Sequence, residues 1–211
     1  MRNNLGLSIF CFILSLLTIS FQPALFAQDK ARQVPAEVKA IAGTYTGSWT
    51  MYGVDEKGQT VKRVAWTDVI KAENPVATGD RAYVSITDEM TFEGGRIPPR
   101  KSQGTEGYML NADGSLGDYF IEVSGQRYRM QKLGKDAWAY AAPADPREVA
   151  SLGFSNVLSA QHALVKVVTQ EEGIETHRIS RLTTVNWKDA EGKQRWTQFI
   201  SLQGFHKRQT P

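Results

Sequence analysis

Three histidines and one glutamate near the C-terminal end of the chain are the residues best suited to chemistry. The histidines of the sequence are His162, His177 and His206, and Glu175 lies two residues before His177. Imidazole and carboxylate groups can bind zinc or iron, exchange protons near neutral pH, or form hydrogen bonds with a ligand. Each of these uses requires the groups to lie on one face of the fold.

A predicted hairpin places His162 and His177 on one face of a sheet. Glu172-Gly173 has the composition of a two-residue turn between two strand-like segments. In that register Val168 lies opposite His177, and His162 lies opposite Thr183. Both histidines then point to the same side, because side chains alternate between the faces of a strand.

A second predicted hairpin adds His206 to that face. If Lys188 faces Lys193 across the turn, Glu175 lies opposite His206, and His177 and His206 are diagonal neighbours with Cα atoms roughly 7 to 8 Å apart. A slip of one residue would separate the two imidazoles onto opposite faces. The apolar residues expected on the shared face are Leu158, Leu164, Val168, Ile179, Val185, Ile200 and Leu202.

This group of residues admits three interpretations. His177 and His206, with Glu175, could bind a divalent metal or a haem iron, could contact the polar head of a ligand, or could form ordinary hydrogen bonds at the rim of the fold. We predict no resident cofactor, and we take Glu175, His177 and His206 as candidate ligand contacts.

Two cations, Lys166 and Arg181, are predicted on the same face as the histidines. A cation that points into an apolar interior can pair with a ligand carboxylate, and the planar guanidinium of Arg181 is suited to a bidentate pair. If that face is exposed instead, both are ordinary surface charges. Arg181 is therefore a further candidate ligand contact.

Motifs for nucleophilic or nucleotide chemistry are absent from the sequence. It contains no Gly-x-Ser-x-Gly elbow, phosphate-binding glycine loop, dinucleotide fingerprint or His-Glu-x-x-His pair. Ser180 and Ser201 are predicted to face each other and to point away from the histidines, which argues against a Ser-His hydrolase. Four acids could form a carboxylate pair that spacing alone does not establish: Asp68, Asp80, Asp88 and Glu89.

Strand-like segments rich in β-branched and aromatic residues fill the chain after residue 43. We predict an all-β, antiparallel up-and-down barrel of about 8 to 10 strands, with a sandwich as the alternative. Short helices are expected near 35–42 and 145–152, and a mobile loop at 93–103. The ten predicted strands are 43–54, 60–73, 81–92, 104–111, 116–124, 126–133, 137–142, 156–170, 174–187 and 194–206.

The first residues predict export. An apolar run from Leu5 to Phe21 follows Arg2, and a small residue, Ala27, precedes a polar one, which is typical of a signal peptide spanning 1–27. The single cysteine, Cys11, lies in that run, so the mature chain would contain no thiol and no disulfide. We expect a secreted or periplasmic protein with no membrane span after cleavage.

The remaining chain is expected to form one domain. An N-terminal segment, 28–42, should precede a single barrel domain at 43–208 and a tail at 209–211. The formal charge is only +3, and the 25 Lys and Arg residues are scattered among 22 acids. This distribution gives no basic patch for nucleic acid, so we predict no nucleic-acid partner.

The start of the predicted barrel resembles a known superfamily. Ala42-Gly43-Thr44-Tyr45-Thr46-Gly47-Ser48-Trp49 is similar to the opening of calycins, which include lipocalins and fatty-acid-binding proteins, and more loosely to secreted bacterial lipocalin-like proteins. The resemblance implies a barrel that binds a ligand. It also implies a structural pair between Trp49, in Gly-x-Trp, and an arginine after the last strand, for which Arg208 is the candidate.

We therefore expect binding of a small, largely apolar or amphipathic ligand in the barrel interior, and binding rather than catalysis. One alternative is a cell-envelope domain that contacts other proteins and has no cavity. Another is a barrel enzyme, an isomerase or hydrolase, that uses a histidine. A binder requires an internal cavity of roughly 300 to 1,000 Å³. The sequence does not indicate the oligomeric state.

Overall fold

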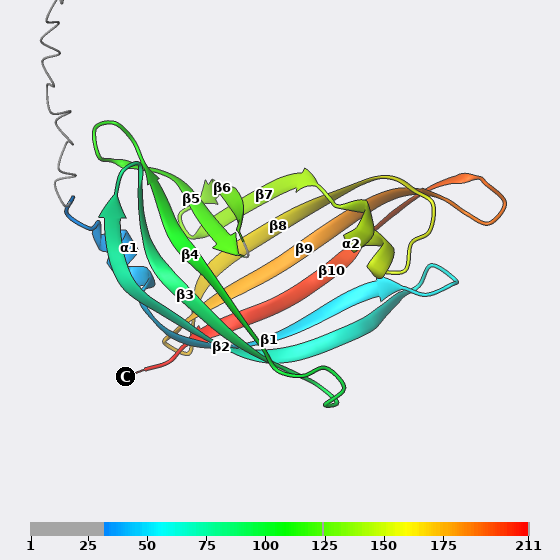
Figure 1. The fold of residues 1–211 in the computed structure, drawn as a ribbon, viewed down its shortest axis with the longest axis horizontal. Coiled ribbons are helices and arrows are strands. Elements are labelled where there is room, and N and C mark those ends of the chain that lie inside the picture. Colours follow the sequence, from blue (N-terminus) through cyan, green and yellow to red (C-terminus); the bar gives the residue numbers. More distant parts are fainter. Residues whose placement is uncertain (1–31, 124, 211) are drawn as a thin grey trace, which may run out of the picture. The chain divides into compact units, whose positions relative to one another are not determined.

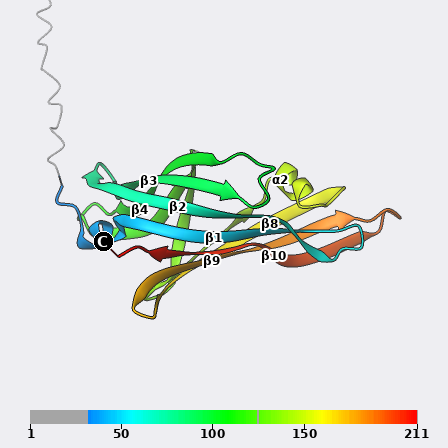
Figure 2. The ribbon, with the colours of Figure 1, turned by 90° about the horizontal axis from the view of Figure 1, so that it is seen from below.

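The computed structural model describes residues 32–123 and 125–210, and the predicted signal peptide lies outside them. Ten antiparallel strands follow one another around a closed barrel, and β1 pairs with β10 to close it (Figure 1). Figure 2 shows β1 between β2 and β10 at this closure. The strands are β1 (Gly43–Val54), β2 (Thr60–Thr78), β3 (Arg81–Phe92), β4 (Arg100–Leu110), β5 (Leu116–Val123), β6 (Gln126–Gly134), β7 (Ala137–Pro143), β8 (Val157–Glu171), β9 (Ile174–Lys188) and β10 (Gln194–Arg208).

The predicted all-β up-and-down barrel is confirmed, and most strand ends lie within two residues of the prediction. Two boundaries were wrong. Strand β2 continues past residue 73 to Thr78, because Asn74-Pro75 forms a bulge in its pairing with β3. Proline has no N–H to donate, and at the bulge no hydrogen bond between the strands requires one. Strand β4 begins at Arg100, which pairs with Met90, so the loop predicted at 93–103 is shorter.

The two predicted short helices are present, and they lie toward opposite ends of the strands (Figure 1). Helix α1 (Ala36–Ile41) buries Val38 completely, in an apolar cluster with Tyr45, Ala72 and Val84. This packing closes one end of the barrel, because the cluster joins the helix to β1, β2 and β3.

Helix α2 (Pro146–Ser151) supports the other end. Its N-cap is Asp145, whose side chain accepts a hydrogen bond of 2.7 Å from the Arg147 amide, and proline occupies the first turn. The helix and the residues after it pack on the barrel wall through this buried cluster: Val54, Ala144, Val149, Leu152, Phe154, Val185 and Phe199. The barrel interior between the two clusters is the region that can hold a site.

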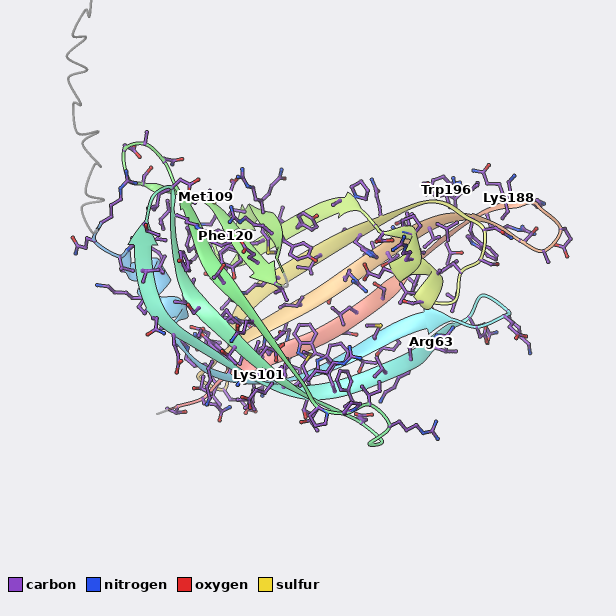
Figure 3. The ribbon with its side chains drawn as sticks, viewed as in Figure 1. Arg63, Lys101, Met109, Phe120, Lys188 and Trp196 are labelled. Carbon is purple, nitrogen blue, oxygen red and sulfur yellow. The ribbon has the colours of Figure 1, made fainter. Side chains whose placement is uncertain are left out.

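Several large apolar side chains are exposed to solvent. Trp196, which is 66% exposed, and Lys188 lie toward the β9–β10 hairpin (Figure 3). Neither helix in the described part of the chain is long and apolar enough to cross a bilayer.

Candidate functional site

An internal cavity of about 420 Å³ lies within the barrel. On most strands its wall is formed by side chains at alternate positions, which is the pattern expected for a barrel interior, whereas consecutive residues of β4 (102–106) and β5 (121–123) also line it. Most of the lining is apolar or aromatic, and ionisable side chains interrupt it at separate points. The apolar residues include Ile70, Ile86, Met90, Ile121, Leu164, Ile179 and Leu202.

All three histidines line this cavity, so their predicted common face is correct. The β8–β9 register is also the predicted one: Val168 pairs with His177, and His162 pairs with Thr183. The turn between these strands has positive φ at Glu172 (54°) and Gly173 (80°), as a two-residue hairpin of this kind requires.

The predicted β9–β10 register is wrong. Lys188 pairs with Gln194 rather than Lys193, and an extra residue, Ser201, then shifts the pairing again. As a result His206 lies opposite His177, and Glu175 does not face His206. The turn is one residue longer than predicted because Asp189 accepts a hydrogen bond of 2.8 Å from the Lys193 amide.

Bulges also change which residues point inward. Ser201 is completely buried and bonded to Arg181 and Thr183, so it lies near the histidine face, contrary to the prediction. Ile200 and Leu158 were predicted inside but are 44% and 51% exposed. Leu158 has no partner in the β8–β9 ladder, and Ile200 directly precedes Ser201, which has none in the β9–β10 ladder. Such bulges change the direction in which neighbouring side chains point.

The first ionic cluster joins β1, β2 and β10. Trp49 donates its indole N–H to Asp68 Oδ2 at 2.7 Å, and His206 Nε2 lies 3.1 Å from the same oxygen. Asp68 and His206 are 5% and 6% exposed. Gly47 makes this arrangement possible, because a Cβ there would lie 2.3 Å from both Asp68 Oδ1 and the His206 ring.

The second cluster lies at the α1 end. His177 Nε2 is 2.8 Å from Glu175 Oε1, and Arg208 Nε donates to the same oxygen at 3.2 Å. These two neighbours hold the pKa of Glu175 down to about 2, and burial lowers the pKa of His177. His177 lines the cavity, whereas Glu175 is not among the described residues that do.

The expected pair of Trp49 and Arg208 is not formed. Arg208 is the register partner of Tyr45 and lies over its ring, with 4.9 Å from the guanidinium carbon to the ring centroid. Trp49 is the partner of Gly204, four positions along β1, and its indole N–H bonds to Asp68. The barrel-closing cation therefore packs on the tyrosine, because β10 ends opposite Tyr45.

The third cluster anchors α2 to the barrel. Arg181 donates to Glu148 Oε1 at 2.5 Å and to Ser201 Oγ at 2.9 Å. His162 Nε2 lies 3.3 Å from Glu148 Oε2, and its Nδ1 lies 2.9 Å from Thr183 Oγ1. The imidazole and then the guanidinium hold the pKa of Glu148 down to about 2. Arg181 lines the cavity, but its charge is already balanced.

The fourth cluster places a buried lysine among polar partners. Lys166 is 3% exposed and donates to Glu106 Oε1 at 2.6 Å and to the Tyr119 hydroxyl at 2.5 Å. Burial opposes ionisation of Glu106, but the charges of Lys166 and His177, together with the hydrogen bonds from Lys166 and Tyr119, lower the pKa of Glu106. Lys166 therefore lines the cavity, as predicted, with its charge compensated.

Asp88 differs from the other acids of the wall. It lines the cavity between Ile70 of β2 and Ser102 of β4, and its buried Oδ1 has no hydrogen-bond partner among the described residues. Burial and then the charge of Asp68 raise the pKa of Asp88 to about 6, although His206 opposes the shift. Asp88 is therefore a carboxylate that forms no ion pair with the residues that the structure describes.

Strand parity is the signal in the sequence that identifies the acids of the cavity wall. Asp68 lies two residues from both Trp66 and Ile70, and Asp88 lies two residues from both Ile86 and Met90. Each acid therefore points to the same side of its strand as a row of apolar side chains. The other two candidate acids, Asp80 and Glu89, do not line the cavity, and Glu89 pairs with Lys101 on the outside. Alternation along the strands, with Asp80 excluded because it precedes β3, would have selected the correct two acids.

The described residues contain no group of three or more His, Cys, Asp or Glu side chains arranged to hold a metal ion. The Nε2 atoms of His177 and His206 instead lie beside Glu175 and Asp68. No protein-family model and no curated protein matches this sequence.

Proposed function

We propose that this protein binds a small, largely apolar ligand inside its barrel, after export from the cell. The observation that carries the proposal is the cavity of about 420 Å³ with a mostly apolar wall. Sites for small molecules commonly have this size and combine an apolar lining with a few polar groups. A cell-envelope contact domain would need no such space and could fill its interior with side chains.

The candidate ligand contacts at the polar positions of the wall are Arg181, His177 and His206. Glu175 would act through His177, which it holds by a hydrogen bond of 2.8 Å. Because each of these groups already has a protein partner, the apolar wall would supply most of the binding free energy through burial of apolar surface.

The test is a titration with N-phenyl-1-naphthylamine, a neutral apolar dye that fluoresces when it leaves water. We expect saturable binding by the wild-type protein and its loss in Leu164→Trp, which places a large ring in the cavity. The matched control is Val165→Trp, because the next residue of β8 is 36% exposed and does not line the cavity.

Thermal melts must show that both variants are folded. Should Leu164→Trp fail to fold, Ala142→Leu on β7 fills the cavity with a smaller change. Dye binding that is absent in the wild type, or that survives in the folded filling variant, would overturn the proposal.

A histidine-based reaction is the second candidate. His177 lines the cavity, and its lowered pKa leaves a neutral imidazole at pH 7 that can accept a proton. Incubation of the protein with the ligand found by native mass spectrometry tests this directly. A change in ligand mass or isomer composition that requires His177 would favour an enzyme, and an unchanged ligand would favour a binder.

A further inference from the structure

We propose that the ligand of this cavity is an amphipathic organic cation, whose protonated amine pairs with Asp88 beside Asp68 while its apolar body lies against the barrel wall. This inference rests on the proposed binding function and adds the charge class of the ligand.

The first step is the unequal pairing of the charged groups on the wall. Lys166 pairs with Glu106 at 2.6 Å, Arg181 with Glu148 at 2.5 Å and His206 with Asp68 at 3.1 Å. In the described part of the chain, Asp88 forms no such pair, and its buried Oδ1 has no hydrogen-bond partner. Ionisation of a carboxylate whose buried oxygen has no partner is unfavourable, and a ligand cation would relieve this.

The second step is the neighbourhood of Asp88. Asp68 lies diagonally across the β2–β3 pairing, since it faces Met90, two residues beyond Asp88. Asp68 is 5% exposed, lines the same cavity, and also has an oxygen, Oδ1, without a partner among the described residues. Two carboxylates that repel each other bind a cation placed near both more strongly than either would alone.

The third step is the charge balance of the whole cavity. Among the described lining residues, the carboxylates outnumber the lysine and arginine, and the lowered pKa of His177 keeps that imidazole neutral. An anionic head group would meet Arg181 and Lys166 only by displacing Glu148 or Glu106. A cationic head group displaces nothing at Asp88.

The fourth step is the shape of the ligand. Ile70 and Ile86 line the cavity around Asp88, and the stacked rings of Trp49 and Trp66, with centroids 6.0 Å apart, line it beside Asp68. Apolar walls favour an organic body, and indole faces also attract cations. A bare metal ion would gain nothing from these walls.

The experiment compares three ligands that share a ten-carbon chain: decylammonium, decanol and decanoate. Their affinities are measured by displacement of N-phenyl-1-naphthylamine at pH 7.5. We expect the wild type to bind decylammonium at least about tenfold more tightly than decanol, and decanoate least, because a charged hydrogen bond adds to the shared apolar contact. In Asp88→Asn the ratio of ammonium to alcohol affinity should fall close to one.

Glu89→Gln is the matched control, since Glu89 is the next residue on β3, does not line the cavity and pairs with Lys101 outside. This variant should keep the wild-type ratio. Thermal melts establish that all three proteins are folded. A wild-type ratio near one with decanol still bound would overturn the amine proposal and leave the binding function intact, whereas loss of all binding would overturn the binding function itself.

Calcium and magnesium distinguish an amine site from a metal site. Either chloride salt alone should not raise the melting temperature of the protein, because the apolar wall offers a bare ion no further contact. Stabilisation by the metal that disappears in Asp88→Asn would indicate a metal site in place of an amine site and would overturn the proposal.

The pH dependence of binding tests the assignment to Asp88. Decylammonium binding should weaken as the pH falls through about 6, because Asp88 gains a proton. The charged and titratable groups that face Asp88 are Asp68 and His206, whereas its register partners Ile70 and Ser102 do not titrate. A pH dependence that is unchanged in Asp88→Asn would contradict the assignment.

Discussion

At the scale of single residues, the charged pairs on the cavity wall make the stability of the barrel sensitive to the loss of one partner. Lys166 is the clearest case, because it is 3% exposed and its ammonium donates to two side chains, Glu106 and Tyr119. A buried charge whose partner is removed retains its full desolvation penalty, whereas removal of both charges does not leave that penalty behind.

Glu106→Gln should therefore lower the free energy of unfolding by about 3 to 5 kcal/mol. The double variant Glu106→Gln with Lys166→Met should be more stable than the single one, because no unpaired charge remains. Urea unfolding followed by tryptophan fluorescence measures both. Equal stability of the wild type and Glu106→Gln would show that water reaches Lys166 and that the pair is not buried in solution.

The sequence predicts the face of the sheet on which a side chain lies more reliably than it predicts the partner that the side chain contacts. The common face of His162, His177 and His206 followed from strand parity and is confirmed. Asp68, the partner of His206, comes from β2, 138 residues earlier in the chain, and Glu148, the partner of His162, comes from α2, which packs back on β8. No local pattern relates these segments, so contacts across the barrel could not be predicted.

At the scale of elements, turns and bulges decide where prediction succeeds. The β8–β9 pairing was predictable because Glu172-Gly173 permits only a narrow choice of turn. The β9–β10 pairing was not, because Asp189 extends its turn and Ser201 adds an unpaired residue inside a regular run of strand residues. Alternation of polar and apolar residues does not reveal a bulge of this kind in advance.

The pairing of β6 and β7 is incomplete, and we predict that a ligand would enter the barrel there. Their ladder extends only from Gln131 with Ala139 to Gly134 with Ala137. Residues 126–130 of β6 therefore have no ladder partner on β7. Beyond the ladder, Tyr128 and Tyr140 cross edge to face at a centroid distance of 5.2 Å, and both line the cavity.

Tyr140→Ala should open this route. We expect association and dissociation of N-phenyl-1-naphthylamine to speed up together by about threefold or more, with a smaller change in the equilibrium constant, because a gate alters the barrier to entry more than the bound state. Stopped-flow fluorescence measures both rates. Tyr83→Ala serves as the control, since Tyr83 does not line the cavity. Unchanged rates in Tyr140→Ala would place the entrance elsewhere.

At the scale of the whole molecule, the ionisable groups of the barrel change the free energy of unfolding with pH in two opposite directions. The pKa of Glu148 and of Glu175 is lowered to about 2, so their contribution is present above their ordinary pKa of 4.5 and is lost as the pH falls toward 2. Acid unfolding should therefore begin below about pH 4.5, at the clusters that hold α2 and the α1 end.

Asp88 acts in the opposite direction. Its pKa is raised from 3.8 to about 6, so the folded state holds its proton more tightly than the unfolded state, and folding is penalised fully only above pH 6. Asp88→Asn should thus be more stable than the wild type by about 1 to 2 kcal/mol at pH 7.5, after allowance for solvent screening of a partly exposed carboxyl. The difference should vanish near pH 4.

Urea unfolding of both proteins from pH 4 to 8 measures this difference directly. The lowered pKa of His177 destabilises both proteins alike as the pH falls, so it cancels in the comparison. A stability difference that is constant with pH would show that Asp88 does not titrate in this range, and a less stable Asp88→Asn would show that its carboxylate has a partner in the ligand-free protein. If a saturating amine pairs with the carboxylate, the sign at pH 7.5 should reverse, because ligand binding then stabilises the wild type preferentially.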